Sequence, residues 1–203
     1  MNNPQGELLA MFPTPLLRKK WTELDNNSKM KSLFLDIEKK FPMDSNLHLT
    51  NTYYTSYNKT LDKPLMEYDV MKPFVNFLSD SIQKLNQFMN FDGEHKFKIR
   101  DMWFAINRQN SYHETHTHSP AIWSGVYYVQ ADDKDASLNL YSPTTSDNHW
   151  ANNIVNEFND FTTNQAVFTP ETGMLNVFPG YLKHSVAQQT VDQDRIAISF
   201  NVV

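Results

Sequence analysis

The sequence predicts an α+β fold, mainly β, in which helices from the first half pack on an antiparallel β-sandwich or jelly roll. Two observations carry this prediction: apolar residues recur at helical spacing in the first half, and short β-like segments separated by polar turns fill the second. The length of 203 residues suits one domain with a sizeable core. We therefore expect one domain over residues 1–203, with 1–95 as a helical support region and 96–203 as the jelly-roll core.

Two segments of the first half have the periodicity of amphipathic helices. The first runs from Asn27 to Phe41 and has Asn and Ser residues available as N-caps. Its apolar positions are Met30, Leu33, Phe34, Ile37 and Phe41. The second is expected from Pro73 to Met89, because proline is tolerated in the first turn of a helix. Its predicted buried side consists of Phe74, Phe77, Leu78, Ile82, Leu85, Phe88 and Met89.

Short β-like segments follow one another from residue 96 onward. The expected strands are Lys96–Asn107, Ala121–Gln130, Ala136–Tyr141, Gln165–Thr169, Gly173–Phe178, Lys183–Gln188 and Asp194–Val203. Short strands at this spacing favour an antiparallel sandwich over βαβ units. The longest stretch without a clear period, Thr144–Thr163, is expected to be a lid or a binding loop.

The composition excludes several classes of function. The chain has no cysteine, so disulfides, thiolate metal sites and a cysteine nucleophile are excluded. The net charge of −5 is spread over both signs and gives no broad basic surface for nucleic acid. No apolar run approaches the ~20 residues of a transmembrane helix, and the N-terminus lacks the features of a signal peptide. We expect a soluble, cytoplasmic protein without a membrane partner.

The placement of the histidines favours a metal site. Three of the seven lie in the segment Tyr112–His118, which reads Y-H-E-T-H-T-H. Residues two apart in an extended segment point to the same side, so His116 and His118 can face one point. His184, just after a predicted turn, is the best candidate for a third ligand from another strand. A single histidine is more often a surface residue without a metal, but this combination favours a facial set of three ligands.

Arg195 is the second signal, because it begins the last apolar strand. Strand alternation divides this strand into two faces. One face has Ile196, Ile198, Phe200 and Val202, and the other has Arg195, Ala197 and Ser199. An unpaired buried charge is costly, so a guanidinium on a core strand needs a partner. A carboxylate held by two parallel hydrogen bonds is the natural partner, and an ordinary internal salt bridge is the structural alternative.

In their order and spacing, these residues resemble the iron(II)/2-oxoglutarate-dependent dioxygenases, specifically their prolyl-hydroxylase-like branch and a group of oxygenases from bacteria and marine phages. The resemblance covers the C-terminal half and a short segment near the start. The matching segments are Met102–Asn107, His116–His118, Trp123–Tyr128, Phe178–Gly180 with His184, Arg195–Asn201 and Met11–Pro15. It implies a double-stranded β-helix with the N-terminal helices packed on one sheet. For a phage-encoded protein it also implies the host cytoplasm as location.

The resemblance further implies a role for each site residue. The three candidate histidines would bind Fe(II), and 2-oxoglutarate would be the co-substrate together with O2. Arg195 would bind the far carboxylate of 2-oxoglutarate, with Ser199 as a helper on the same face. Asn107 falls where relatives often place a polar residue that contacts the co-substrate. The expected enzyme is a dioxygenase that hydroxylates a C–H bond and converts 2-oxoglutarate to succinate and CO2.

One position departs from the pattern of the superfamily. The superfamily usually has His-x-Asp or His-x-Glu, whereas this chain has His118 at the carboxylate position. Three neutral imidazoles leave an Fe(II) site one unit more positive than two imidazoles and a carboxylate. Glu114 shares strand parity with His116 and would supply a carboxylate instead if the segment is locally extended.

The sequence leaves the primary substrate open. A peptidyl prolyl or other side chain is the first expectation by analogy, and a free amino acid, a small metabolite or a nucleobase are the alternatives. Six aromatic residues are candidates for the pocket wall, although we expect at least half of them to fill the core. These are Tyr112, Trp123, Tyr127, Tyr128, Tyr141 and Trp150.

Other functions fit parts of the same pattern. A cupin-like metalloprotein would share the jelly roll and the three histidines, but it would not use 2-oxoglutarate and would have no need of Arg195. A non-catalytic β-sandwich protein would keep its binding activity after metal removal. A zinc hydrolase would need a general base, for which Glu114 is the candidate. An exposed edge strand would allow a homodimer, although nothing in the sequence requires one.

Overall fold

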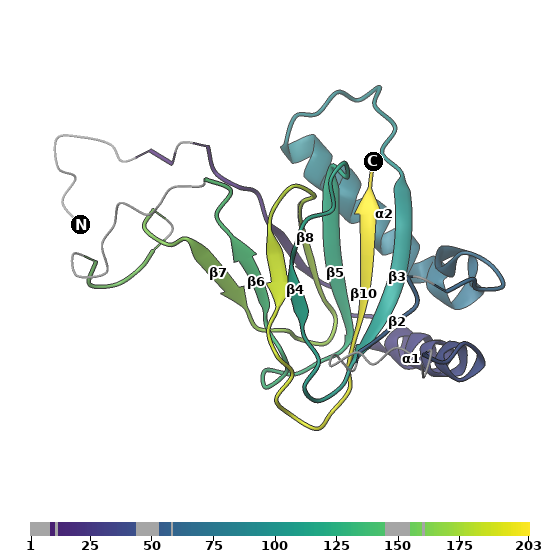
Figure 1. Cartoon of the computed structure of the whole chain (residues 1–203). Coiled ribbons are helices and arrows are strands. Elements are labelled where there is room, and N and C mark those ends of the chain that lie inside the picture. Colours follow the sequence, from purple (N-terminus) through teal and green to yellow (C-terminus); the bar gives the residue numbers. More distant parts are fainter. Residues whose placement is uncertain (1–8, 11, 44–52, 58, 145–154, 160) are drawn as a thin grey trace.

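The computed structural model describes residues 9–10, 12–43, 53–57, 59–144, 155–159 and 161–203. Two α-helices and ten strands lie in these ranges (Figure 1). The helices are α1 (Leu24–Lys40) and α2 (Lys72–Phe88), and two short 3-10 helices, Leu65–Glu67 and Asp69–Met71, precede α2. The strands are β1 (Leu17–Lys20), β2 (Tyr54–Thr55), β3 (Ile99–Asn107), β4 (His113–His116), β5 (Trp123–Gln130), β6 (Leu138–Tyr141), β7 (Gln165–Phe168), β8 (Met174–Pro179), β9 (His184–Val186) and β10 (Arg195–Val202).

The strands form two antiparallel sheets. The larger sheet has the order β1-β8-β5-β10-β3-β2, and the smaller has the order β4-β9-β6-β7. From β3 onward the chain passes back and forth between them, because β3, β5, β8 and β10 belong to the larger sheet and β4, β6, β7 and β9 to the smaller. This alternation is the double-stranded β-helix that the sequence predicts (Figure 1).

The helices cover one face of the larger sheet. Phe34 of α1 stacks on Phe104 of β3, with ring centroids 4.2 Å apart, and Phe74 of α2 packs at 4.7 Å against Tyr127 of β5. The predicted apolar face of β10 joins the same core, since Ile196, Ile198, Phe200 and Val202 are all buried in one cluster with residues of both helices. The opposite face of β10 points toward the smaller sheet. None of the described helices is long and apolar enough to cross a membrane.

The predicted helices and strands are present, with ends that differ by at most three residues. Pro73 lies in the first turn of α2, as expected. The prediction that Phe88 is buried is wrong, because its side chain is 85% exposed. Phe88 is the last residue of α2, and Met89 packs against the core in its place.

Three strands were not predicted from the sequence. Residues Leu17–Lys20 form β1 at the edge of the larger sheet, where they pair with β8. Tyr54–Thr55 form β2, which pairs with β3 at the other edge, and the histidine segment itself forms β4. β2 has only two residues, and β1 (Leu-Arg-Lys-Lys) and β4 (His-Glu-Thr-His) are almost entirely polar, so none of the three shows the apolar alternation of a half-buried strand. Most of the expected lid, Thr144–Thr163, falls outside the described residues.

Candidate active site

The jelly roll brings the three candidate histidines together. His116 of β4 pairs directly opposite His184 of β9. The backbone N–H of His118 donates to the carbonyl oxygen of Gly180 at 2.8 Å, which ties the segment to the turn before β9. A Cβ atom at Gly180 would lie 2.2 Å from the carbonyl oxygen of Ala121, so only glycine fits at this close contact. One strand pair and one turn therefore fix all three side chains.

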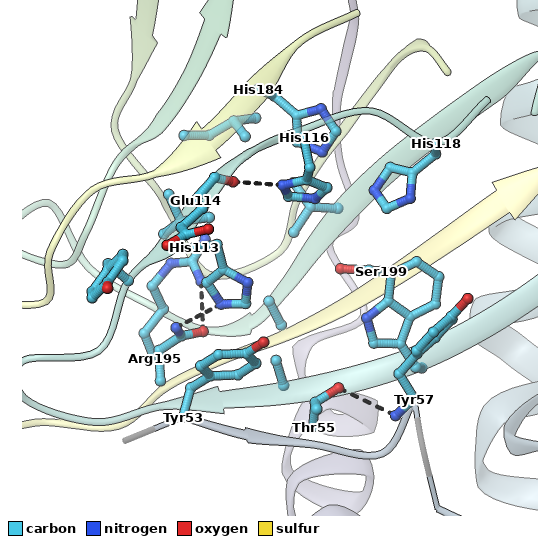
Figure 2. A pocket seen from close by; sticks show the side chains of 18 of the residues that line it. Tyr53, Thr55, Tyr57, His113, Glu114, His116, His118, His184, Arg195 and Ser199 are labelled. Carbon is cyan, nitrogen blue, oxygen red and sulfur yellow. Dashed lines mark hydrogen bonds between the residues drawn. The ribbon is translucent and has the colours of Figure 1, made fainter. Parts of the chain in front are cut away.

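The three rings have the spacing of a metal site. One nitrogen of each ring lies within 4.8 Å of the other two, and Figure 2 shows the rings gathered on one side of the pocket. His116 Nδ1 donates to the carbonyl oxygen of Glu114 at 2.7 Å, and His184 Nδ1 donates to that of Leu182 at 2.9 Å. Because a carbonyl oxygen only accepts, Nδ1 carries the proton in both rings and Nε2 keeps its lone pair for a metal.

The protonation of these rings also suits a metal ligand. Burial lowers the pKa of His184 to about 3 and that of His118 to about 4, and the neighbouring His116 adds to both shifts. Only a neutral imidazole offers a lone pair, so both rings can bind a metal at neutral pH without first losing a proton. In the part of the chain that the structure describes, no other group of three His, Asp or Glu side chains has this spacing.

Glu114 lines the same pocket, but its carboxylate is not part of the group with metal-ligand spacing. Its side chain is exposed, and its backbone carbonyl orients His116. The pairing of β4 with β9 shifts register between His113 and His116, which interrupts the alternation along this segment. This geometry gives no support to the alternative in which Glu114 supplies a metal ligand.

Arg195 lies at the other end of the pocket (Figure 2). Its side chain is 2% exposed, its Nη1 donates to Asn107 Oδ1 at 3.2 Å, and its guanidinium carbon lies 4.9 Å from the ring centre of Tyr128. Among the described residues it forms no ion pair, and its Nε has no hydrogen-bond partner. A buried guanidinium without an anion is costly, so the site fits a carboxylate that a ligand supplies.

Two further residues were predicted to contact the co-substrate. Asn107 is fully buried opposite Arg195, and its amide nitrogen faces Ser111 Oγ at 3.2 Å and His113 Nε2 at 2.8 Å. Both amide hydrogens are thus engaged, so Asn107 holds the side chains of Arg195 and His113 in place by hydrogen bonds on the buried side of the pocket. Ser199 lines the pocket from the same strand as Arg195, nearer the histidines (Figure 2). Direct contact of either residue with the co-substrate stays a prediction.

The pocket between Arg195 and the histidines has a volume of about 670 Å³, which is ample for a small co-substrate and part of a second molecule. Among the lining residues that sequence reasoning missed are Tyr53, Thr55, Tyr57 and His113. The first three come from β2 and its flanks, whose only local signal is a run of aromatic and β-branched residues. His113 is the first of the three histidines of its segment, but it is not among the three histidines that have metal-ligand spacing.

The aromatic candidates divide as expected between core and pocket. Trp123, Tyr127 and Tyr128 fill the core. Tyr112 lines the pocket, and the hydroxyl group of Tyr141 shares a hydrogen bond of 3.0 Å with Ser185. Trp150 lies outside the described residues. The wall near the histidines is instead built by Trp103, whose ring centroid is 5.6 Å from that of His118, and by Tyr57, which meets Trp103 edge-on at 4.9 Å.

Comparison with known proteins agrees with this geometry. Residues 101–201 match a family described as "Putative 2OG-Fe(II) oxygenase", in which 2OG stands for 2-oxoglutarate. No curated protein matches the chain. Among solved structures, a prolyl-4-hydroxylase from Pseudomonas putida has a TM-score of 0.64 at 11% identity, with 93% of this chain and 92% of that chain covered.

Two further structures have the same fold. HygX from Streptomyces hygroscopicus, with nickel and 2-oxoglutarate bound, has a TM-score of 0.60 at 12% identity over 93% of this chain and 82% of that one. A Trichoplax adhaerens prolyl hydroxylase in complex with a hypoxia inducible factor peptide fragment has a TM-score of 0.60 at 10% identity, over 92% and 82%. The family match spans β3 to β10, which carry the three histidines and the buried arginine. The chain thus belongs to the 2OG-Fe(II) oxygenase family, whose enzymes typically use Fe(II) and 2-oxoglutarate.

Proposed function

We propose that this enzyme hydroxylates a C–H bond of an organic or peptidyl substrate, with His116, His118 and His184 as the ligands of Fe(II). In the balanced reaction, one atom of O2 enters the C–H bond and the other enters succinate, while 2-oxoglutarate loses CO2. The bound metal would supply the activation of O2. The protein would hold the co-substrate and the substrate in position and exclude bulk water.

The observation that carries this proposal is the presence of Arg195 in the same pocket as the three histidines. A guanidinium matches a carboxylate with two parallel hydrogen bonds, and the unpartnered Nε of Arg195 is free to make one of them. 2-Oxoglutarate has one carboxylate beside its keto group for the metal and a second at its far end for Arg195. A cupin-like protein that does not use 2-oxoglutarate has no need of this buried arginine.

The charge of the site also supports a dianionic co-substrate. Three neutral imidazoles add no negative charge to the metal, and Arg195 adds a further positive charge to the pocket. Of the described lining residues only Glu114 is acidic, and its side chain is exposed. A dianion that bridges the metal and Arg195 would therefore gain attraction at both ends in a partly dehydrated pocket.

The substrate would approach from the histidine side, because Arg195 and the co-substrate would occupy the opposite end. Tyr57 and Trp103 form the wall on that side. Two of the similar structures are prolyl hydroxylases, one of them with a peptide fragment bound, and HygX has also been solved with hygromycin B bound. A peptidyl prolyl side chain is therefore the first substrate to test, and a small metabolite is the second.

The proposal is tested by adding 2-oxoglutarate to anaerobic, Fe(II)-loaded protein and recording the weak visible charge-transfer band of the chelate. We expect the band in the unaltered protein, a weaker band with Arg195→Ala and none with His184→Ala. His95→Ala is the matched control, because His95 is exposed and outside the metal group. Bound iron without a band would contradict the use of 2-oxoglutarate and favour the cupin-like function. Absence of iron binding would favour a non-catalytic β-sandwich protein.

A further inference from the structure

His113 lies between the two ends of the site. It is the first residue of β4, and Figure 2 shows its ring between Arg195 and His116, with Tyr53 beside it. The ring centroids of His113 and Tyr53 are 4.2 Å apart. His113 does not belong to the group with metal-ligand spacing, so its place in the pocket calls for another explanation.

The hydrogen bonds behind His113 determine which of its nitrogens carries the proton. Arg195 can only donate, so the atom of Asn107 that faces it must be the oxygen Oδ1. The amide nitrogen of Asn107 then points to Ser111 Oγ and to His113 Nε2. A rotated amide would set the NH2 group against the guanidinium, donor against donor. Since an amide nitrogen only donates, His113 Nε2 must accept, and the single ring proton must be on Nδ1.

The surroundings keep this ring neutral. Burial and, to a smaller extent, the positive charge of Arg195 lower the pKa of His113 to about 3. Protonation at Nε2 would also break the hydrogen bond from Asn107, because the amide nitrogen that faces Nε2 is itself a donor. The ring of Tyr53 packs against that of His113 at an angle of 37° between the planes, and Asn107 binds Nε2 at 2.8 Å, so two contacts hold the ring and with it the direction of the Nδ1–H bond. The pocket therefore holds a rigid neutral donor close to a rigid cationic one.

We propose that His113 is a co-substrate-binding residue whose Nδ1–H donates to the carboxylate that Arg195 binds. Arg195, Asn107 and His113 then act as one hydrogen-bonded unit that selects a 2-oxo acid with a second carboxylate. Arg195 supplies charge, His113 supplies a directed hydrogen bond, and Asn107 holds both in place from the buried side. This inference rests on the proposed function, because it assigns a partner to the far carboxylate of 2-oxoglutarate.

The test compares two 2-oxo acids that differ only at the far end. 2-Oxopentanoate has the chain length of 2-oxoglutarate, but a methyl group replaces the far carboxylate. Dissociation constants for both acids are measured from the charge-transfer band of the anaerobic Fe(II) protein and of three variants. His113→Phe keeps a ring without hydrogen bonds, His113→Gln keeps an acceptor near Nε2, and His113→Asn keeps an N–H near Nδ1.

We expect His113→Phe and His113→Gln to weaken 2-oxoglutarate binding roughly tenfold or more, as for the loss of a hydrogen bond to a charged group. His113→Asn should retain most of the affinity. The dissociation constant of 2-oxopentanoate should be the same in all four proteins. If His113 only supported the structure of the pocket, its substitution would weaken the binding of both acids. Equal losses for both acids, or no loss for either, would overturn the inference while the proposed function stands. Absence of a band with either acid in the unaltered protein would overturn both.

A second measurement uses the unaltered, metal-free protein, so it does not depend on whether any variant folds. Nitrogen-15 NMR of the metal-free protein at neutral pH reports which ring nitrogen of each histidine carries the proton. We expect His113 to have a protonated Nδ1 and an unprotonated Nε2. A proton on Nε2, in either the neutral or the cationic ring, would contradict the orientation of Asn107 and overturn the inference.

Discussion

The two faces of the larger sheet share the same strands but differ in chemistry. Toward the helices, β10 presents only apolar side chains, and all of them are buried in one cluster. Toward the smaller sheet, the same strand presents Arg195 with an unpartnered Nε. The first face gains stability from the burial of apolar area, whereas the second holds a charge that folding alone does not compensate. Stability and ligand binding should therefore respond separately to substitutions on the two faces.

The largest stability effect is expected on the helix face. Phe34 has no exposed surface and stacks on Phe104 with their planes 5° apart. Phe34→Ala should lower the free energy of unfolding by about 3–5 kcal/mol, because it leaves a cavity in a close-packed core. Urea denaturation measures this loss, and Phe88→Ala, on an 85% exposed side chain, is the matched control. If the folded fraction of Phe34→Ala bound 2-oxoglutarate more weakly, the two faces would not be independent.

A fall in pH should lower the free energy of unfolding mainly through the histidines that line the pocket. Burial lowers the pKa of both His113 and His184 to about 3, whereas an unfolded histidine has a pKa of about 6.5. Below pH 6.5 the unfolded metal-free chain binds more protons than the folded one. Above about pH 6.5 these histidines therefore do not reduce the free energy of unfolding. Below it, the free energy of unfolding falls until the pH reaches the pKa that the histidines have in the folded protein.

For the metal-free protein we expect a loss of roughly 2–4 kcal/mol between pH 7 and pH 5, measured by urea denaturation at each pH. His113→Phe should make this loss smaller. His95→Gln, which removes an exposed histidine, should leave it unchanged. An equal slope in all three proteins would mean that the pocket histidines do not determine the acid response.

The smallest expected effect is a rise in the free energy of unfolding, whereas the two effects above are losses. Arg195→Met replaces a buried cation by an apolar chain, so we expect the free energy of unfolding to rise by about 1–2 kcal/mol in the absence of ligands. The same substitution should weaken the band with 2-oxoglutarate, as expected for Arg195→Ala. Arg195→Lys keeps the charge but not the planar pair of donors, and should recover little of the binding. A loss of stability in Arg195→Met would show that the guanidinium is already compensated in the free protein.

Local periodicity was enough to predict much of this fold. The two helices and seven of the ten strands follow from apolar spacing, and strand alternation correctly placed Arg195, Ala197 and Ser199 on the face opposite the apolar core. The same local rule failed for β2, which has only two residues, and for β1 and β4, whose residues are almost all polar and therefore show no apolar alternation. It also failed at Phe88, where the apolar stripe of α2 continues past the last residue that meets the core.

The sequence by itself determined the parts of the site that depend on spacing along one segment or on the identity of single residues. His116 and His118 lie two apart, the absence of cysteine leaves His, Asp and Glu as the ligands of a transition metal, and Arg195 is a charge on an apolar strand. The tertiary structure alone decided which segments meet there. His184 faces His116, Asn107 faces Arg195, and Tyr53 packs on His113 only because distant strands pair in one register. That register depends on the packing of both sheets and the helices together, a non-local balance that no single segment contains.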